Sequence, residues 1–143
     1  MRVLPGGIWY EPNELGLSNI LVPAASTVFG NIVPWNAVAG LRRVVVFFQV
    51  VSGTGTPFDV NFRPFDADGL SPLDVNQAAW TGIPNTSYCW WADDNTPRPK
   101  SGASSPTISL GLMMGSPFMQ PNIDNNDVAN GANVSLRILL ARS

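Results

Sequence analysis

LRRVVVFFQVV (residues 41–51) is a run of β-branched and aromatic residues between Gly40 and the small-residue segment 52–55. Val, Ile and Phe fit the pleated surface of a sheet, and the helix-breaking residues at both ends limit the run to the length of one strand. Both faces of so apolar a run need cover, with Arg42 and Arg43 marking one solvent-facing end. The run therefore predicts a strand in the middle of a sheet that packs against a second layer.

Two further segments, 57–63 and 133–140, alternate apolar and polar residues with the period of a β-strand. The apolar positions are Phe58, Val60 and Phe62 in the first and Val134, Leu136 and Ile138 in the second. Such alternation predicts strands with one buried face and one face that meets solvent or a contact.

The remaining elements are predicted from short β-prone segments and turn residues. We expect two short β pieces in 26–35, a turn in 66–69, a helical turn in 74–80, strands in 87–92 and 107–114, and a loop over 115–131. About six to eight short strands without a long amphipathic helix predict an all-β fold. The expected architecture is an antiparallel β-sandwich with a jelly-roll-like body.

Composition limits the functions open to the chain. At 143 residues it is long enough for one domain with its own core. Charged residues make up 13% of the chain, about half of the usual share of ~25%. The net charge is −2 and the eight basic residues are scattered, so nucleic acid binding is not expected. A surface with so few charges suits contact with other subunits.

The residue types that carry most enzyme chemistry are scarce. The chain has no histidine and one cysteine, Cys89, so zinc sites and Ser-His-Asp catalysis are excluded and no disulfide can form within the chain. We expect no enzyme activity, no cofactor and no metal. The start of the sequence lacks the apolar core of a signal peptide, and no apolar run is long enough to span a membrane, so we expect a protein made and used without secretion.

Residues 1–23 are rich in apolar side chains but follow neither the helical nor the strand period. Pro and Gly interrupt them too often for a helix, so they predict an extended N-terminal arm ahead of a single β-sandwich domain in 24–143. Two placements stay open: the arm packs along its own domain or forms an edge strand, or it lies on a neighbouring subunit. In both cases the core of the body is not expected to require it.

The five tryptophans are the one constellation that suggests a binding surface. Trp90 and Trp91 are adjacent in a predicted strand, so their side chains point to opposite faces. A core or subunit-interface role is favoured, and a platform for sugar rings is the alternative. The predicted interface residues of the arm and of this strand are Leu4, Ile8, Trp9, Tyr10, Leu15, Leu17, Trp90 and Trp91.

An apolar, Pro- and Gly-punctuated arm ahead of a His-free, low-charge, all-β body resembles the small decoration (cement) proteins on the heads of tailed bacteriophages. The resemblance is one of architecture. It implies a structural virion protein without an active site, a homotrimer made in the host cytoplasm and seated on the capsid exterior, with arms that contact neighbours and the major capsid protein as partner. Two other functions stay open: a carbohydrate- or receptor-binding module, for example of a phage tail fibre, and a small jelly-roll coat protein.

Overall fold

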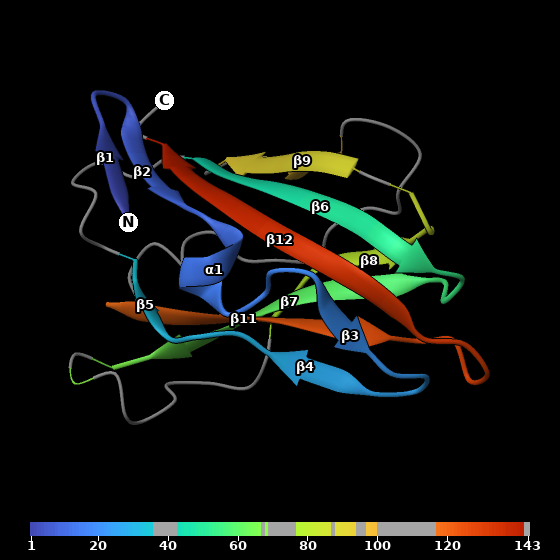
Figure 1. Cartoon of the computed structure of the whole chain (residues 1–143). Helices are drawn as coiled ribbons and strands as arrows, with labels where there is room; N and C mark the ends of the chain where they lie inside the picture. The colour runs from blue at the N-terminus through green and yellow to red at the C-terminus, as the bar shows by residue number, and fades with distance from the viewer. Residues whose placement is uncertain are drawn as a thin grey trace.

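Two antiparallel β-sheets lie face to face in the computed structural model, which describes residues 1–35, 43–66, 68, 77–86, 88–93, 97–99 and 117–141 (Figure 1). Sheet A has the strand order β1 (Arg2–Leu4), β2 (Gly7–Tyr10), β12 (Ala132–Ala141), β6 (Arg43–Gly53), β9 (Tyr88–Asp93) and β10 (Pro97–Pro99), and β3 (Ile20–Val22) also pairs with β12. Sheet B has the order β4 (Thr27–Phe29), β11 (Phe118–Asn125), β7 (Phe58–Phe65) and β8 (Gln77–Ile83), and β5 (Val33–Pro34) also pairs with β11.

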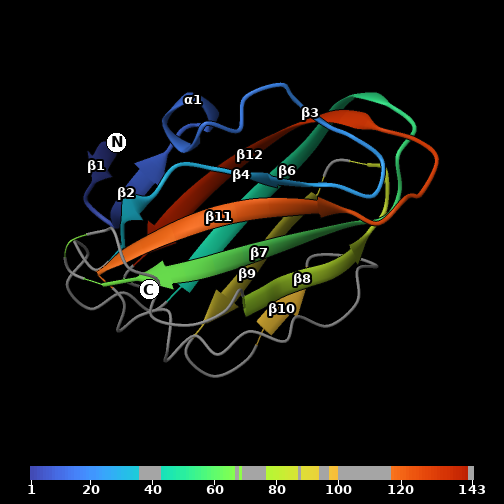
Figure 2. The ribbon, with the colours of Figure 1, turned by 90° about the horizontal axis from the view of Figure 1, so that it is seen from below.

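The chain crosses repeatedly from one sheet to the other. After β3 of sheet A it forms β4 and β5 in sheet B, β6 in sheet A, β7 and β8 in sheet B, β9 and β10 in sheet A, β11 in sheet B and β12 in sheet A. The central strands therefore follow the orders β2-β12-β6-β9 and β4-β11-β7-β8, with the second set in front in Figure 2. This is jelly-roll topology, and it confirms the predicted all-β sandwich.

The core lies between the sheets and is built from the alternating positions of the predicted strands. Val44, Val46 and Phe48 of β6 are buried. Phe58, Val60 and Phe62 of β7 and Val134, Leu136 and Ile138 of β12 are fully buried as well. Strand β6 lies between β12 and β9, so residues 43–51 of the predicted strand belong to a central strand of sheet A.

Residues 7–22 form an interrupted strand along β12. Strand β2 pairs with Ile138–Ala141, the carbonyl of Leu17 accepts a 3.0 Å hydrogen bond from the amide of Leu136, and β3 pairs with residues 132–134. The helical turn α1 (Pro12–Leu15) separates these contacts. A capping box between Glu11 and Glu14 begins it, and Gly16 ends it in the left-handed conformation (φ 67°). Of the two predicted placements of the arm, the structure shows the one on its own domain.

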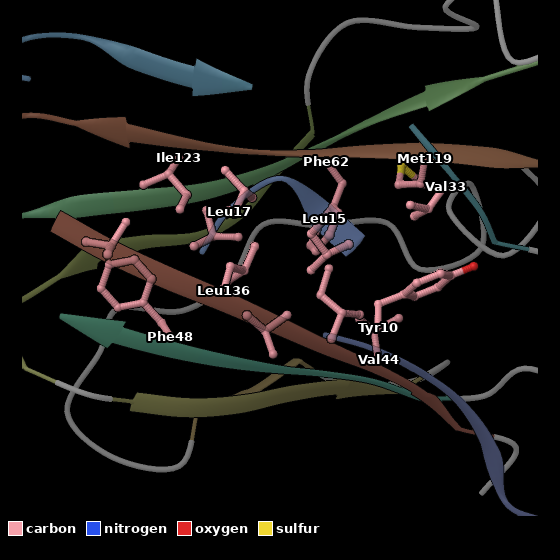
Figure 3. Close-up of a cluster of buried hydrophobic side chains, with 14 of the residues drawn as sticks. Tyr10, Leu15, Leu17, Val33, Val44, Phe48, Phe62, Met119, Ile123 and Leu136 are labelled. Atoms are coloured by element: carbon pink, nitrogen blue, oxygen red, sulfur yellow. The ribbon is translucent and has the colours of Figure 1, made fainter. Parts of the chain in front are cut away.

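The expectation that the core does not require this segment is wrong. Leu15 and Leu17 are fully buried between the sheets, beside Leu136 and Phe62 (Figure 3). The amide of Asn31 also donates to the carbonyl of Leu15 at 2.7 Å, which ties α1 to the connection between β4 and β5. Residues 7–22 form a short strand, a helical turn and another short strand, so the spacing of their apolar residues changes twice. Neither the strand period nor the helix period is therefore visible in this segment of the sequence.

Two other elements differ from the predictions. Residues 77–80 belong to strand β8 rather than to a helical turn, and the predicted loop 115–131 contains β11, a central strand of sheet B. The carbonyl of Pro121 accepts a 2.7 Å hydrogen bond from the backbone N–H of Gly30, so the Pro121 nitrogen is also on the side of the gap between β4 and β5. No strand partner there needs an N–H donor from residue 121, and the proline is tolerated. The predicted strand in 107–114 lies outside the described residues.

Candidate contact surface

Aromatic and charged side chains gather on the outer face of sheet A, where β2, β12 and β6 lie side by side. Arg137 of β12 is the register partner of Phe47 of β6. The Arg137 guanidinium carbon lies 5.3 Å from the centroid of the Trp9 ring, and the Trp9 and Phe47 ring centroids are 5.3 Å apart. All three side chains are half-buried. With Glu11 they form what we term the Trp9 cluster.

Glu11 holds this cluster together electrostatically. Its carboxylate accepts hydrogen bonds from Arg2 (2.8 Å), from Arg137 (3.0 Å) and from the indole N–H of Trp9. The hydrogen bond from Trp9, followed by the positive charges of Arg137 and Arg2, lowers the pKa of the Glu11 carboxyl. One carboxylate therefore connects β1, β2 and β12 ahead of the first turn of α1.

Acidification is expected to loosen these contacts. Because folding lowers the pKa of Glu11, its contribution to stability is present above the unfolded-state pKa and is lost as the pH falls through the folded-state pKa. The chemical shift of the Trp9 indole N–H, assigned with Trp9→Phe, should report a transition with a midpoint below pH 4.5. Glu11→Gln should abolish the transition, and a midpoint above pH 4.5 would contradict the structure.

Strand β1 lies at the end of sheet A (Figure 1) and carries exposed apolar side chains. The exposed fraction is 68% for Val3 and 39% for Leu4, and Met1 beside them is exposed too. A solvated edge strand usually carries charged side chains that discourage pairing with other chains. The exposed residues of β1 and the Trp9 cluster together are the candidate contact surface.

The structure divides the predicted interface residues into three groups. Leu4 and Trp9 belong to the contact surface. Ile8, Tyr10, Leu15 and Leu17 are buried in the core of their own chain, so placing them at an interface was wrong for this structure. Trp90 and Trp91 lie on β9, where their backbone partners are Val46 and Val45 of β6, and their side chains lie outside what the structure describes.

A polar network on the outer face of sheet B was not predicted from the sequence. Asp124 of β11 accepts hydrogen bonds from the Thr27 hydroxyl of β4 and, at 2.7 Å, from the Asn61 amide of β7. Asp59, also on β7, accepts a 3.0 Å hydrogen bond from the backbone N–H of Gly82 on β8. Asn61 is buried although it occupies a polar position of the alternating pattern. The alternating pattern predicted which face of the sheet each side chain is on. It did not predict that side chains on the polar face, such as Asn61, are buried as well.

Removing Asp124 should destabilise the sandwich. Asp124→Ala removes an ionised acceptor of two hydrogen bonds, at about 1.5–3 kcal/mol for a bond to a charged group. Relief of the like charge of Asp59, its register partner, returns only about 0.2–1 kcal/mol. Urea unfolding should therefore show a lower free energy of unfolding for Asp124→Ala. The decrease should be larger than that for Thr27→Val, which removes one of the two hydrogen bonds. An equal or smaller loss for Asp124→Ala would contradict the network.

A shallow polar depression of about 340 Å³ is lined by Ala25, Ser26, Thr27, Asp124, Asn125 and Asn126. Two of its polar side chains are engaged within the chain: Asp124 accepts the hydrogen bonds described above, and the Asn125 side-chain amide donates to the carbonyls of Val22 (3.2 Å) and Asn130 (2.9 Å). Within the part of the chain that the structure describes, no three acidic or cysteine side chains are placed to hold a metal ion. Nor does any helix there reach the length and hydropathy of a membrane span.

No family model and no curated protein sequence matches the chain. Among solved structures, it is similar to a chain of infectious bursal disease virus, Gx strain (11% identity, 95% of this chain, 32% of that chain, TM-score 0.43). It is also similar to the exo-β-1,3-galactanase of Phanerochaete chrysosporium (14% identity, 96% of this chain, 30% of that chain, TM-score 0.40). A third similar structure is the catalytic unit of an α-1,3-glucanase of Streptomyces thermodiastaticus (9% identity, 95% of this chain, 27% of that chain, TM-score 0.35). The chain spans about a third of the length of these proteins or less. Its fold class rests on its own strand order.

Proposed function

We propose that the chain is a structural virion protein that decorates the outside of a capsid and stabilises it through contacts between subunits. The observation that carries the proposal is the candidate contact surface. A sheet face in water normally presents polar side chains, whereas this one carries Trp9 and Phe47 and continues to the exposed Leu4 of β1. The exposed Val3 lies on the opposite face of the same edge strand. Such a surface favours a protein that acts by contact and not by catalysis.

The mechanism is burial of apolar area at several points at once. Each apolar Å² removed from water contributes about 25 cal/mol, and simultaneous attachment multiplies weak individual contacts. The proposed assembly is a homotrimer bound to the major capsid protein on the capsid exterior, made in the host cytoplasm. Jelly rolls serve in viral capsids and in lectins, so the fold is compatible with this function by analogy alone.

The Trp9 cluster favours contact over sugar recognition. Trp9 already donates its indole N–H to Glu11, and Arg137 lies over its ring, so the groups that a sugar would use are engaged within the chain. A sugar platform would need other aromatic side chains than Trp9.

Capsid binding by paired surface variants tests the proposal. Mass spectrometry of purified virions should detect the chain, and the recombinant protein should rebind virions stripped of it. Val3→Asp combined with Leu4→Asp should abolish rebinding without unfolding the protein, because both side chains are exposed. Val128→Asp, at an 85% exposed apolar residue between β11 and β12, is the matched control. Normal rebinding by the double variant, glycan binding without capsid binding, or shells assembled from this chain alone would overturn the proposal.

A further inference from the structure

The attachment of the chain to its own fold changes abruptly between residues 6 and 7. All residues of 1–6 are exposed, whereas Gly7 and Ile8 are buried. A Cβ atom added at Gly6 would meet nothing within 4 Å, but one added at Gly7 would lie 1.9 Å from the carbonyl oxygen of Leu140. Strand β1 is therefore joined through Pro5 and Gly6 to a segment that is firmly packed.

Little holds β1 where it lies. Among the strands that the structure describes, it pairs with β2 alone, through the partners Arg2 with Trp9, Val3 with Ile8 and Leu4 with Gly7. Two exposed ion pairs attach this end of the chain: Arg2 with Glu11 at 2.8 Å, with exposed side-chain fractions of 61% and 34%, and the Met1 ammonium with the carboxylate of Glu14. Exposed ion pairs of this kind contribute little to stability, and β1 places no side chain in the core.

We propose that β1 is an exchangeable strand, which leaves its own β2 and pairs with β2 of a second copy of this chain in the same register. A second copy is a suitable partner because the edge of its β2 is the edge with which a β1 of the same sequence pairs in the structure. Exchange reproduces the three backbone pairs and the bond from Arg2 to Glu11, so only the connection through Pro5 and Gly6 changes. It also brings the exposed Val3 and Leu4 to a subunit interface. The inference rests on the proposed function, because it specifies how decorating copies join one another.

Disulfide trapping between two different copies tests the exchange. Val3 and Ile8 are direct partners beside a two-residue hairpin connection, a position whose Cα atoms come close enough for a disulfide. In a Cys89→Ser background, a tagged Val3→Cys chain is mixed with an Ile8→Cys chain under mild oxidation. Exchange predicts a disulfide-linked heterodimer in at least ~10-fold higher yield than with Val128→Cys in place of Ile8→Cys. Equal yields from the two mixtures would overturn the proposal.

A measurement on the unsubstituted chain guards against misfolding of the Ile8→Cys variant. In a mixture of isotope-labelled and unlabelled copies, isotope-filtered NMR should show contacts between the Val3 methyls of one copy and the Ile8 methyls of another. Contacts restricted to one copy would overturn exchange. A chain that binds capsids but shows no exchange refutes only this inference, whereas a chain that exchanges strands but is missing from virions refutes only the proposed function.

Discussion

Deletion of residues 1–22 should prevent folding, whereas deletion of residues 1–6 should leave the sandwich intact. The longer deletion removes five buried core side chains: Ile8, Tyr10, Leu15, Leu17 and Val22. Truncating one large core side chain costs about 2–5 kcal/mol, and a whole domain is stable by only about 5–15 kcal/mol. The shorter deletion removes exposed side chains and one edge strand. Circular dichroism and dispersion of amide NMR signals should distinguish a β-rich fold from an unfolded chain.

A single substitution separates loss of core packing from the effects of shortening the chain. Leu17→Ala should cost about 2–5 kcal/mol in urea unfolding, because Leu17 is fully buried between the sheets. Leu21→Ala is the matched control, since Leu21 on β3 is 55% exposed and should change stability by about 0.5 kcal/mol or less. A soluble, folded product of the 1–22 deletion together with a silent Leu17→Ala would show that the arm is separate from the core after all.

Gly7→Ala should be among the most damaging single substitutions in the chain. The added Cβ would lie 1.9 Å from the Leu140 carbonyl oxygen and 3.0 Å from the Ala141 Cα. These are backbone atoms of a central strand, so β2 must move away from β12 to make room. Overpacking costs about 1–3 kcal/mol where side chains can adjust, and loss of strand pairing adds to it, so we expect about 3–5 kcal/mol in urea unfolding.

The neighbouring glycine supplies the control for this substitution. Gly6→Ala adds the same methyl group one residue earlier, where no atom lies within 4 Å. Its effect on the free energy of unfolding should stay within about 0.5 kcal/mol. If the two variants were equally stable, the close approach of β2 to β12 would be wrong.

The strands that face the core could be predicted from sequence because burial imposes a period of two. Phe58 and Leu136 each belong to such a pattern, and each is buried. Val44 is buried too, but its strand was predicted from a continuous apolar run of β-branched and aromatic residues. The pattern failed where a residue's environment depends on a distant part of the chain. Strand β11 contains Pro121 and many polar residues, and only the position of Gly30 in the gap between β4 and β5 makes that proline acceptable.

Two of the residues predicted at an interface lie on the candidate contact surface. Leu4 and Trp9 were selected from the apolar composition of residues 1–23, and both lie on that surface. Ile8 and Leu17 have the same composition, but they are buried because the segment runs along β12. The partners of Trp9 could not be predicted, because Phe47 and Arg137 come beside it only through the register of three strands from distant parts of the sequence.

The pairing of β2 with β12 has a consequence for how the protein is made. Residues 7–10 form part of the core, but their partner strand is residues 138–141, so their pairing must wait until that distant segment has left the ribosome. Pairing between such distant segments closes a long loop, which makes folding slow compared with that of proteins built from local contacts. The apolar segment 8–22 stays exposed during this time, when chains are most prone to aggregate. Completion of β12 is therefore the step that commits the nascent chain to its fold.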